Sequence, residues 1–167
     1  VKMSDRFCEI EAGKIDLTDD SYLVSDDPCD IEALALAIRT SGLFNPPVLK
    51  VEKDSYVVVS GKPQILAMHH NKQQKFVSLV MPEETSALAA TIRAIQSVAF
   101  SRELNPTELL RAVDRLLGFM TPNELALQSK AIFGRNYQAR YIDQVAAISA
   151  LPDPAFRLMQ EGNVAFK

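Results

Sequence analysis

The spacing of apolar residues divides the chain into a first part with strand-like runs and a second part with helical spacing alone. Short runs rich in Val, Ile, Tyr and Phe predict four strands: one around Cys8, and others at 48–52, 56–60 and 76–80. Only a few residues, with Lys-Asp at their centre, separate the second run from the third, which indicates a hairpin. A small mixed α/β domain is therefore expected at the start of the chain.

Two helices are expected among these strands. Apolar residues at helical spacing predict a helix over 28–41, with Asp27 as its N-cap and Pro28 at its first position. Gly42 follows as a left-handed C-terminal stop. A second, shorter helix is expected over 63–71, between the hairpin and the last strand.

From Thr85 onward the strand signals end and the apolar positions recur only at helical spacing. Two helices are predicted from apolar stripes: Leu88, Ile92, Ile95 and Ala99 form the first, and Leu109, Leu110, Val113, Leu116 and Leu117, which follow Pro106, form the second. A third helix is predicted to start at Thr121-Pro122-Asn123-Glu124. A fourth is predicted to start at 135–138, with the stripe Tyr141, Val145 and Ile148, and a short last helix is expected over 156–160. The second part is thus expected to be an all-helical bundle.

Charge is distributed unevenly along the chain, which changes the expectation about partners. The net charge is -3 over 167 residues, but residues 1–60 carry six Lys and Arg against twelve Asp and Glu, and residues 61–167 carry twelve against nine. A local positive field is what attracts phosphate, so the second part is the better candidate for nucleic-acid binding. No apolar run reaches the roughly 20 residues of a membrane helix, and the two cysteines have no metal-ligand spacing, so a cytoplasmic protein is expected.

Four segments in order resemble one known family. They are 33–48, with its glycine stop and Leu-x-x-Pro step, the turn Ser60-Gly61-Lys62, the segment Leu104-Asn105-Pro106, and the helix-turn-helix-like segment after 121. Together they are similar to ParB-type chromosome and plasmid partition proteins, whose N-terminal domain shares a fold with sulfiredoxin. The resemblance implies an α+β chain: a small mixed-sheet ParB/sulfiredoxin-like domain over 1–84, a connecting helix over 85–104, and a helical DNA-binding domain over 105–167 that is truncated at its C-terminus.

The resemblance also locates a nucleotide site that this chain has altered. The family's phosphate loop reads Gly-Glu-Arg-Arg with a further Arg in the next helix, and here its arginines are replaced by Pro63, Gln64 and Leu66. Of the family's second motif, Glu-Asn-x-Gln-Arg, only the arginine remains. The corresponding nucleotide-binding positions are Gly61, Lys62, Arg102 and Glu103. Because neither Gln nor Pro supplies the bidentate bonds of an arginine fork, we expect neither tight binding of CTP with Mg²⁺ nor its hydrolysis.

The downstream helices resemble the family's DNA-reading unit. In this interpretation 122–131 supports a second helix over 136–149 that lies in the major groove. The candidate DNA-binding residues are Lys130, Arg135, Asn136, Tyr137, Gln138 and Arg140. Asn and Gln can bond adenine in two places, Arg can bond guanine, and cations meet phosphates. The expected spacer over 128–134 is longer than the family's tight turn, and an ordinary antiparallel helix pair with a solvated polar face is the alternative.

The resulting hypothesis is a ParB-like protein that binds double-stranded DNA in plasmid or chromosome partition or in transcriptional control, associated with the nucleoid. The resemblance further implies a homodimer formed through a segment outside this chain and a partition or regulatory protein partner. No catalytic residue and no metal ligand are assigned. Two alternatives stay open: a nuclease or nucleotide-hydrolysing enzyme of the same fold, or an interaction module that has lost both activities. The acidic residues Asp19, Asp20, Asp26, Asp27 and Asp30 could hold Mg²⁺ in a nuclease, but loop solvation and helix capping explain them with fewer assumptions.

Overall fold

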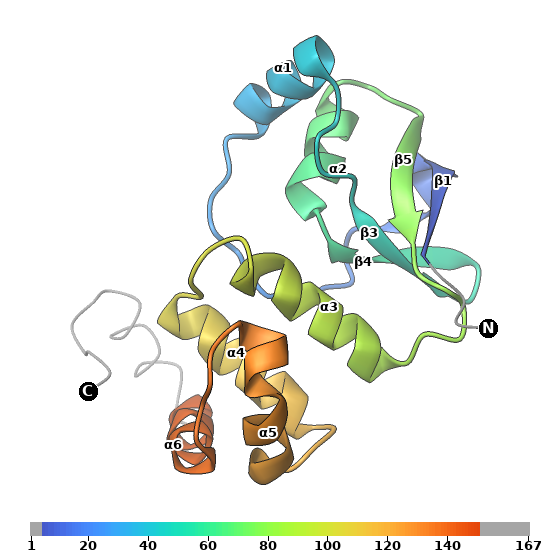
Figure 1. Ribbon diagram of the computed structural model, residues 1–167. Coiled ribbons are helices and arrows are strands. Elements are labelled where there is room, and N and C mark those ends of the chain that lie inside the picture. The colour runs from blue at the N-terminus through green and yellow to red at the C-terminus, as the bar shows by residue number, and fades with distance from the viewer. Residues whose placement is uncertain (1–4, 151–167) are drawn as a thin grey trace. The chain divides into compact units, whose positions relative to one another are not determined.

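The computed structural model describes residues 5–150, and its packing separates the chain into two units, Val1–Ala90 and Thr91–Lys167. The described elements follow the chain in this order: β1 (Arg6–Glu11), η1 (Ala12–Lys14), β2 (Ile15–Asp16), α1 (Ile31–Ser41), β3 (Val48–Glu52), β4 (Ser55–Ser60), α2 (Lys62–His70), β5 (Lys75–Val80), α3 (Ala87–Ala99), α4 (Pro106–Leu117), α5 (Pro122–Phe133) and α6 (Ala139–Ser149) (Figure 1). The strands all precede α3, and the later elements are all helices. The expected α+β class is confirmed.

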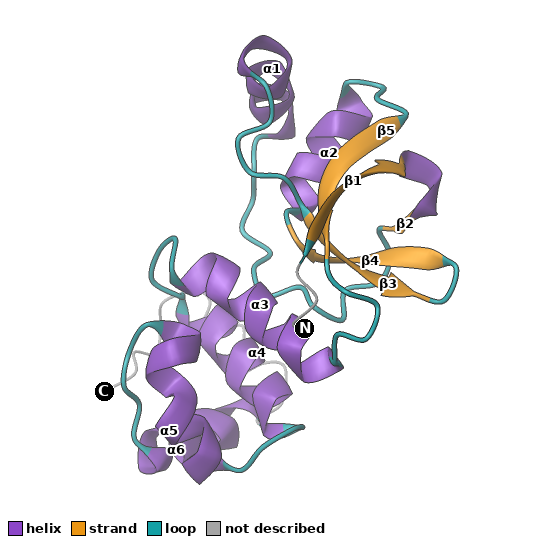
Figure 2. Ribbon diagram, turned by 45° about the vertical axis from the view of Figure 1, so that its right-hand side comes forward, coloured by secondary structure: helices purple, strands orange, loops and turns teal. Residues whose placement is uncertain are grey.

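The first unit is built on a mixed five-stranded sheet with the strand order β1-β5-β3-β4-β2 (Figure 2). The expected hairpin is present, because β3 and β4 pair antiparallel and Lys53 adopts a positive φ at the turn. β1 pairs antiparallel with β5, whereas β3 with β5 and β2 with β4 are parallel pairs. The two-residue strand β2 was not predicted, since a run that short carries no periodicity.

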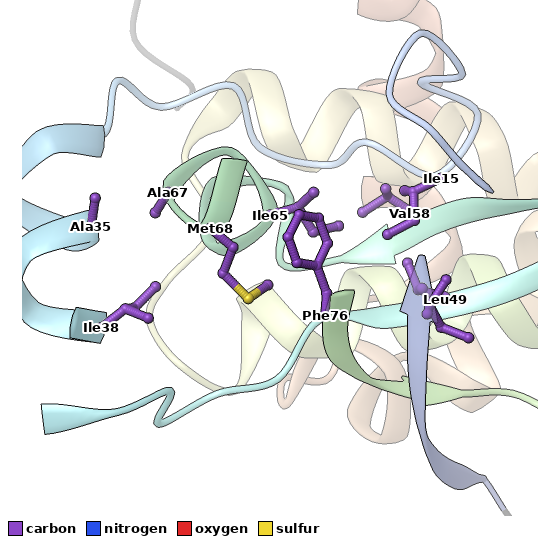
Figure 3. Packing of buried hydrophobic residues seen from close by; sticks show 10 residues of the cluster. Ile15, Ala35, Ile38, Leu49, Val58, Ile65, Ala67, Met68 and Phe76 are labelled. Atoms are coloured by element: carbon purple, nitrogen blue, oxygen red, sulfur yellow. The ribbon is translucent and has the colours of Figure 1, made fainter. Parts of the chain in front are cut away.

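The core of the first unit lies between the sheet and α2. Leu49, Ile65 and Phe76 are fully buried there, and Val58 and Met68 pack with them (Figure 3). Ala35 and Ile38 of α1 belong to the same cluster, so α1 adds a further layer beside α2. The apolar alternation along the strands is what places these side chains on one face.

α1 begins three residues later than the sequence predicted. Its N-cap is Asp30, whose Oδ1 accepts a hydrogen bond of 2.9 Å from the Ala33 backbone N–H, and Pro28 lies outside the helix. Asp30 outcompetes Asp27 because the apolar helix pattern starts directly after it, at Ile31. The expected glycine stop is present, since Gly42 has φ 86° and its N–H donates to the Ile38 carbonyl.

In the second unit, α4, α5 and α6 pack against one another. Buried apolar residues from each helix form its centre: Leu110, Val113 and Leu116 from α4, Leu125 and Ile132 from α5, and Ile142 and Val145 from α6. The predicted stripe of the fourth helix, Tyr141, Val145 and Ile148, was wrong in its phase, because Ile142 is buried while Tyr141 and Ile148 are half-buried. The helix predicted over 156–160 lies outside the described residues.

The largest correction concerns the connection between the last two described helices. α5 continues to Phe133, so 128–133 is helical, and the expected long spacer over 128–134 does not exist. α6 starts at Ala139 rather than at 136, which leaves residues 134–138 as a short turn. Gly134 ends α5 in the left-handed conformation with φ 71°, and this glycine stop explains the boundary.

Candidate nucleic-acid interface

α4 begins with a capping box that includes a charged residue. The sequence indicated this start only by the proline at position 106. Asn105 is the N-cap of α4: its Oδ1 accepts from the Glu108 N–H at 2.9 Å, and its own N–H donates to Glu108 Oε2 at 2.9 Å. This reciprocal capping box satisfies two backbone donors that the helix itself cannot bond. Glu108 is fully buried, so its carboxylate needs a cationic partner as well.

Arg102 is that partner. Its Nη1 and Nη2 donate to Glu108 Oε2 and Oε1 at 2.8 Å and 2.7 Å, in the bidentate geometry that makes an arginine–carboxylate pair strong. Nη1 also donates to the Glu103 carbonyl at 3.0 Å. The one arginine that survives from the family's second nucleotide motif is therefore engaged in holding the start of α4.

The other positions that correspond to nucleotide-binding residues lie in the first unit and have internal partners too. Lys62 Nζ lies 2.6 Å from Asp20 Oδ1. Gly61 has φ 86°, and a Cβ built on it would lie 2.8 Å from Pro47 Cα. The backbone of Pro47 thus requires a glycine here for packing alone. Two carboxylates in the acidic part of the chain also have internal partners. Asp16 Oδ1 accepts hydrogen bonds from the Thr18 and Asp19 N–H groups, and Asp30 caps α1.

The turn between α5 and α6 is held by a side chain from inside α5. Ser129 is fully buried, and its Oγ accepts a hydrogen bond of 2.9 Å from the Tyr137 N–H while donating to the Ala126 carbonyl at 2.8 Å. The Tyr137 ring meets Phe133 edge-on at 5.4 Å and stacks on Tyr141 at 5.2 Å. Burial is the main cause that raises the pKa of the Tyr137 hydroxyl above its usual value; Tyr141 and Glu103 add to the rise and Arg135 opposes it.

Most of the predicted DNA-binding residues are gathered at this turn. Lys130 is exposed near the end of α5, Arg135, Asn136 and Gln138 are exposed in the turn, and Arg140 is exposed in the first turn of α6. Tyr137 differs, because it is half-buried and packed between two aromatic rings. The structure therefore brings these exposed side chains together around one turn, and Tyr137 packs beside them.

Sequence reasoning missed a further polar residue on the same surface. Gln144 is exposed and lies four residues after Arg140, so both share the face of α6 opposite the buried Ile142 and Val145. Asp143 is exposed beside it. The predicted stripe of Tyr141, Val145 and Ile148 concealed this face, whereas a stripe that includes Ile142 and Val145 places Arg140 and Gln144 opposite to it.

A segment of the same unit runs along the C-terminal end of α5. Gln96 Nε2 donates to the Ala131 carbonyl at 3.0 Å, and the Phe100 ring lies 3.5 Å from where a Cβ on Gly134 would be. Glu103 Oε1 then lies 2.8 Å from Arg135 Nη1. One candidate nucleotide-binding residue, Glu103, is thus paired with one candidate DNA-binding residue.

Replacing Arg102 should destabilise the helical unit. We expect Arg102→Ala to lower the free energy of unfolding by about 2–3 kcal/mol, somewhat less than the loss from a fully buried pair, because the Arg102 side chain is 42% exposed. The free energy of unfolding of Arg102→Lys should lie between those of the wild type and Arg102→Ala, since a single ammonium group cannot reproduce the two parallel hydrogen bonds of the guanidinium. Urea denaturation followed by helical circular dichroism measures both, with Arg135→Ala as the exposed-pair control; an Arg102→Ala unfolding curve that overlays the wild type contradicts the assignment.

Gly61→Ala tests whether this glycine is required by packing. We expect a loss of about 2 kcal/mol or more in the free energy of unfolding, from the positive φ together with the clash against Pro47. Gly13→Ala is the matched control, because a Cβ there meets nothing within 4 Å. Equal stabilities of the two variants in the same denaturation experiment would show that the bend at Gly61 is not constrained.

Comparison with known proteins identifies the fold of this chain. No protein-family model matches the sequence, and no curated protein matches it significantly. Among solved structures, the C-terminally truncated chromosome-partitioning protein ParB from Caulobacter crescentus, complexed to the centromeric parS site, superposes with a TM-score of 0.59 at 16% identity, over 95% of this chain and 80% of that chain. The same protein complexed with CTP-γ-S gives a TM-score of 0.49 at 19% identity, over 95% and 86%.

A third similar structure is a Pnob8-like ParB-N domain, with a TM-score of 0.51 at 14% identity, over 77% of this chain and 50% of that chain. At these identities the likeness concerns the fold. It agrees with the order of elements found here, in which a mixed sheet with two helices precedes a set of packed helices. The chain therefore has the ParB-like fold that its sequence resembles.

Proposed function

We propose that this chain binds double-stranded DNA through α5, the turn 134–138 and α6, with the start of α6 in the major groove. The observation that carries the proposal is the two-sided character of α6. Ile142 and Val145 anchor one side in the helical unit, while Arg140 and Gln144 are exposed on the other. A helix fixed on one side with exposed polar side chains at its N-terminal end is the arrangement by which helix-turn-helix proteins read base edges.

The exposed side chains have the chemistry for base readout. Arg140 can bond guanine O6 and N7, and Gln144 can bond adenine N6 and N7. Four residues of helix rise about 6 Å, which is close to the spacing of two base pairs. Asn136 and Gln138 precede the helix and extend the same polar surface. Tyr137 is assigned a positioning role, because its N–H and its ring are both engaged within the protein.

We expect the cations Lys130, Arg135 and Arg140 to contact the phosphates of the duplex. Lys130 is exposed on α5, and within residues 5–150 no acidic group lies within ion-pair distance of Lys130 or Arg140. Arg135 has Glu103 as its partner. Cations of this kind fix register on the duplex and supply most of the salt-dependent affinity.

The fold likeness supports a role of the same general kind, since the similar Caulobacter crescentus structure is complexed to a centromeric site. We infer partition of a plasmid or chromosome, or transcriptional control from a bound site. We also infer that no CTP switch operates. Lys62 in the first unit is paired with Asp20, and Arg102 in the second unit is paired with Glu108, so each of these two cations already has an anionic partner.

Binding of the wild-type chain to a mixed-sequence duplex should weaken steeply as salt rises. Replacing Lys130 with Ala should reduce the slope of log affinity against log salt by about one, because one phosphate contact is lost. Arg140→Ala should cost about 1–3 kcal/mol on a target selected from random DNA and relax the preference at one position. Fluorescence anisotropy measures both, with Arg39→Ala in the exposed last turn of α1 as the matched control.

Equal effects of Arg39→Ala and Arg140→Ala would remove α6 from the interface. Absence of duplex binding at about 50 mM salt would refute the proposal as a whole. Consumption of CTP, or cleavage of the duplex in Mg²⁺, would instead favour the enzyme alternative, and neither binding nor turnover would favour the interaction module.

A further inference from the structure

Among the three cations of the proposed interface, Arg135 alone is bound by a carboxylate of the described chain, that of Glu103. The Nη1–Oε1 distance is 2.8 Å. The Arg135 and Glu103 side chains are 57% and 69% exposed, so water and an incoming duplex can reach the pair. An exposed pair of this kind adds little to stability, which leaves a role in binding open to it.

The position of Glu103 is fixed by its surroundings rather than by the ion pair itself. On one side the Arg102 guanidinium donates hydrogen bonds both to the Glu103 carbonyl and to the buried Glu108 carboxylate. On the other side the helix that precedes it lies along α5, through Gln96 on Ala131 and Phe100 on Gly134. Glu103 is therefore presented to the turn by ordered backbone, so its pairing with Arg135 requires no further ordering of the backbone.

A guanidinium fork accepts a carboxylate and a phosphate with the same geometry. A phosphate that binds Arg135 through Nη1 must therefore displace the Glu103 carboxylate. The remaining negative charge of Glu103 would also lie close to the phosphate backbone and repel it. Both effects lower affinity for any duplex, whatever its sequence.

We propose that Glu103 is an affinity-setting residue of the DNA interface: its carboxylate occupies the phosphate position at Arg135 and keeps sequence-independent binding weak. This exchange does not change the base contacts of α6. The protein therefore keeps its preference for its target sequence, while its affinity for every duplex changes by a similar factor. The inference rests on the proposed DNA-binding function and names the contact that regulates it.

The test compares Glu103→Gln with wild type on a mixed-sequence duplex at about 50 mM and about 200 mM salt. Gln keeps the shape of the side chain and removes the charge. We expect Glu103→Gln to bind about two- to fivefold more tightly at the lower salt, with a steeper salt slope by about one. Asp114→Asn is the matched control, because it removes one exposed charge from the same unit and should change affinity less.

Repeating the comparison in an Arg135→Ala protein tests whether the effect of Glu103 depends on Arg135. In Arg135→Ala the gain from Glu103→Gln should be much smaller, because no guanidinium remains for the phosphate to bind and only the repulsion by the Glu103 charge is relieved. Wild-type binding with no gain in Glu103→Gln, or a gain of the same size in Arg135→Ala, overturns this inference and leaves the DNA-binding proposal standing. Failure of both wild type and Glu103→Gln to bind any duplex overturns the DNA-binding proposal and, with it, the role of Glu103.

Discussion

The buried carboxylate of Glu108 is the constraint around which the helical unit is arranged. A charge without solvent exposure must be compensated, and here the compensation comes from the Arg102 fork and the Asn105 N–H. The same carboxylate completes the capping box that starts α4. The pair thereby fixes the chain between α3 and α4, so that residues on either side of Arg102 have defined places beside α5.

This constraint links the two chemistries that the family resemblance suggested. An arginine that matches a nucleotide motif is used here for structure, and the next residue, Glu103, pairs with Arg135 in the turn 134–138. Lys62 is likewise neutralised by Asp20 in the first unit. Positive charge is retained without an acidic partner, within the described residues, at Lys130 and Arg140. This distribution of charge is the basis on which we propose a duplex, rather than a triphosphate, as the anionic ligand.

The sequence predicted the element types well because the patterns are strong: the hairpin, the glycine stop at Gly42 and the Thr121 helix start all appear in the structure. Its errors occurred where two capping options compete. Asp27 with Pro28 looked like a good helix start, but Asp30 lies next to the apolar stripe and is the cap. The turn 134–138 was misplaced because it depends on Ser129 and Tyr137, eight residues apart, whose contact leaves no periodic signal. Ion pairs such as Glu103–Arg135 were equally invisible, since they join distant segments.

The most direct test of this account is a nuclear magnetic resonance titration of the isotope-labelled chain with a short duplex. The account predicts that backbone amides of 134–144 and of Lys130 shift or broaden first, while amides of β1 and β5 stay unchanged. Shifts that centre on the sheet and spare α6, at a salt concentration where the duplex binds, would contradict it.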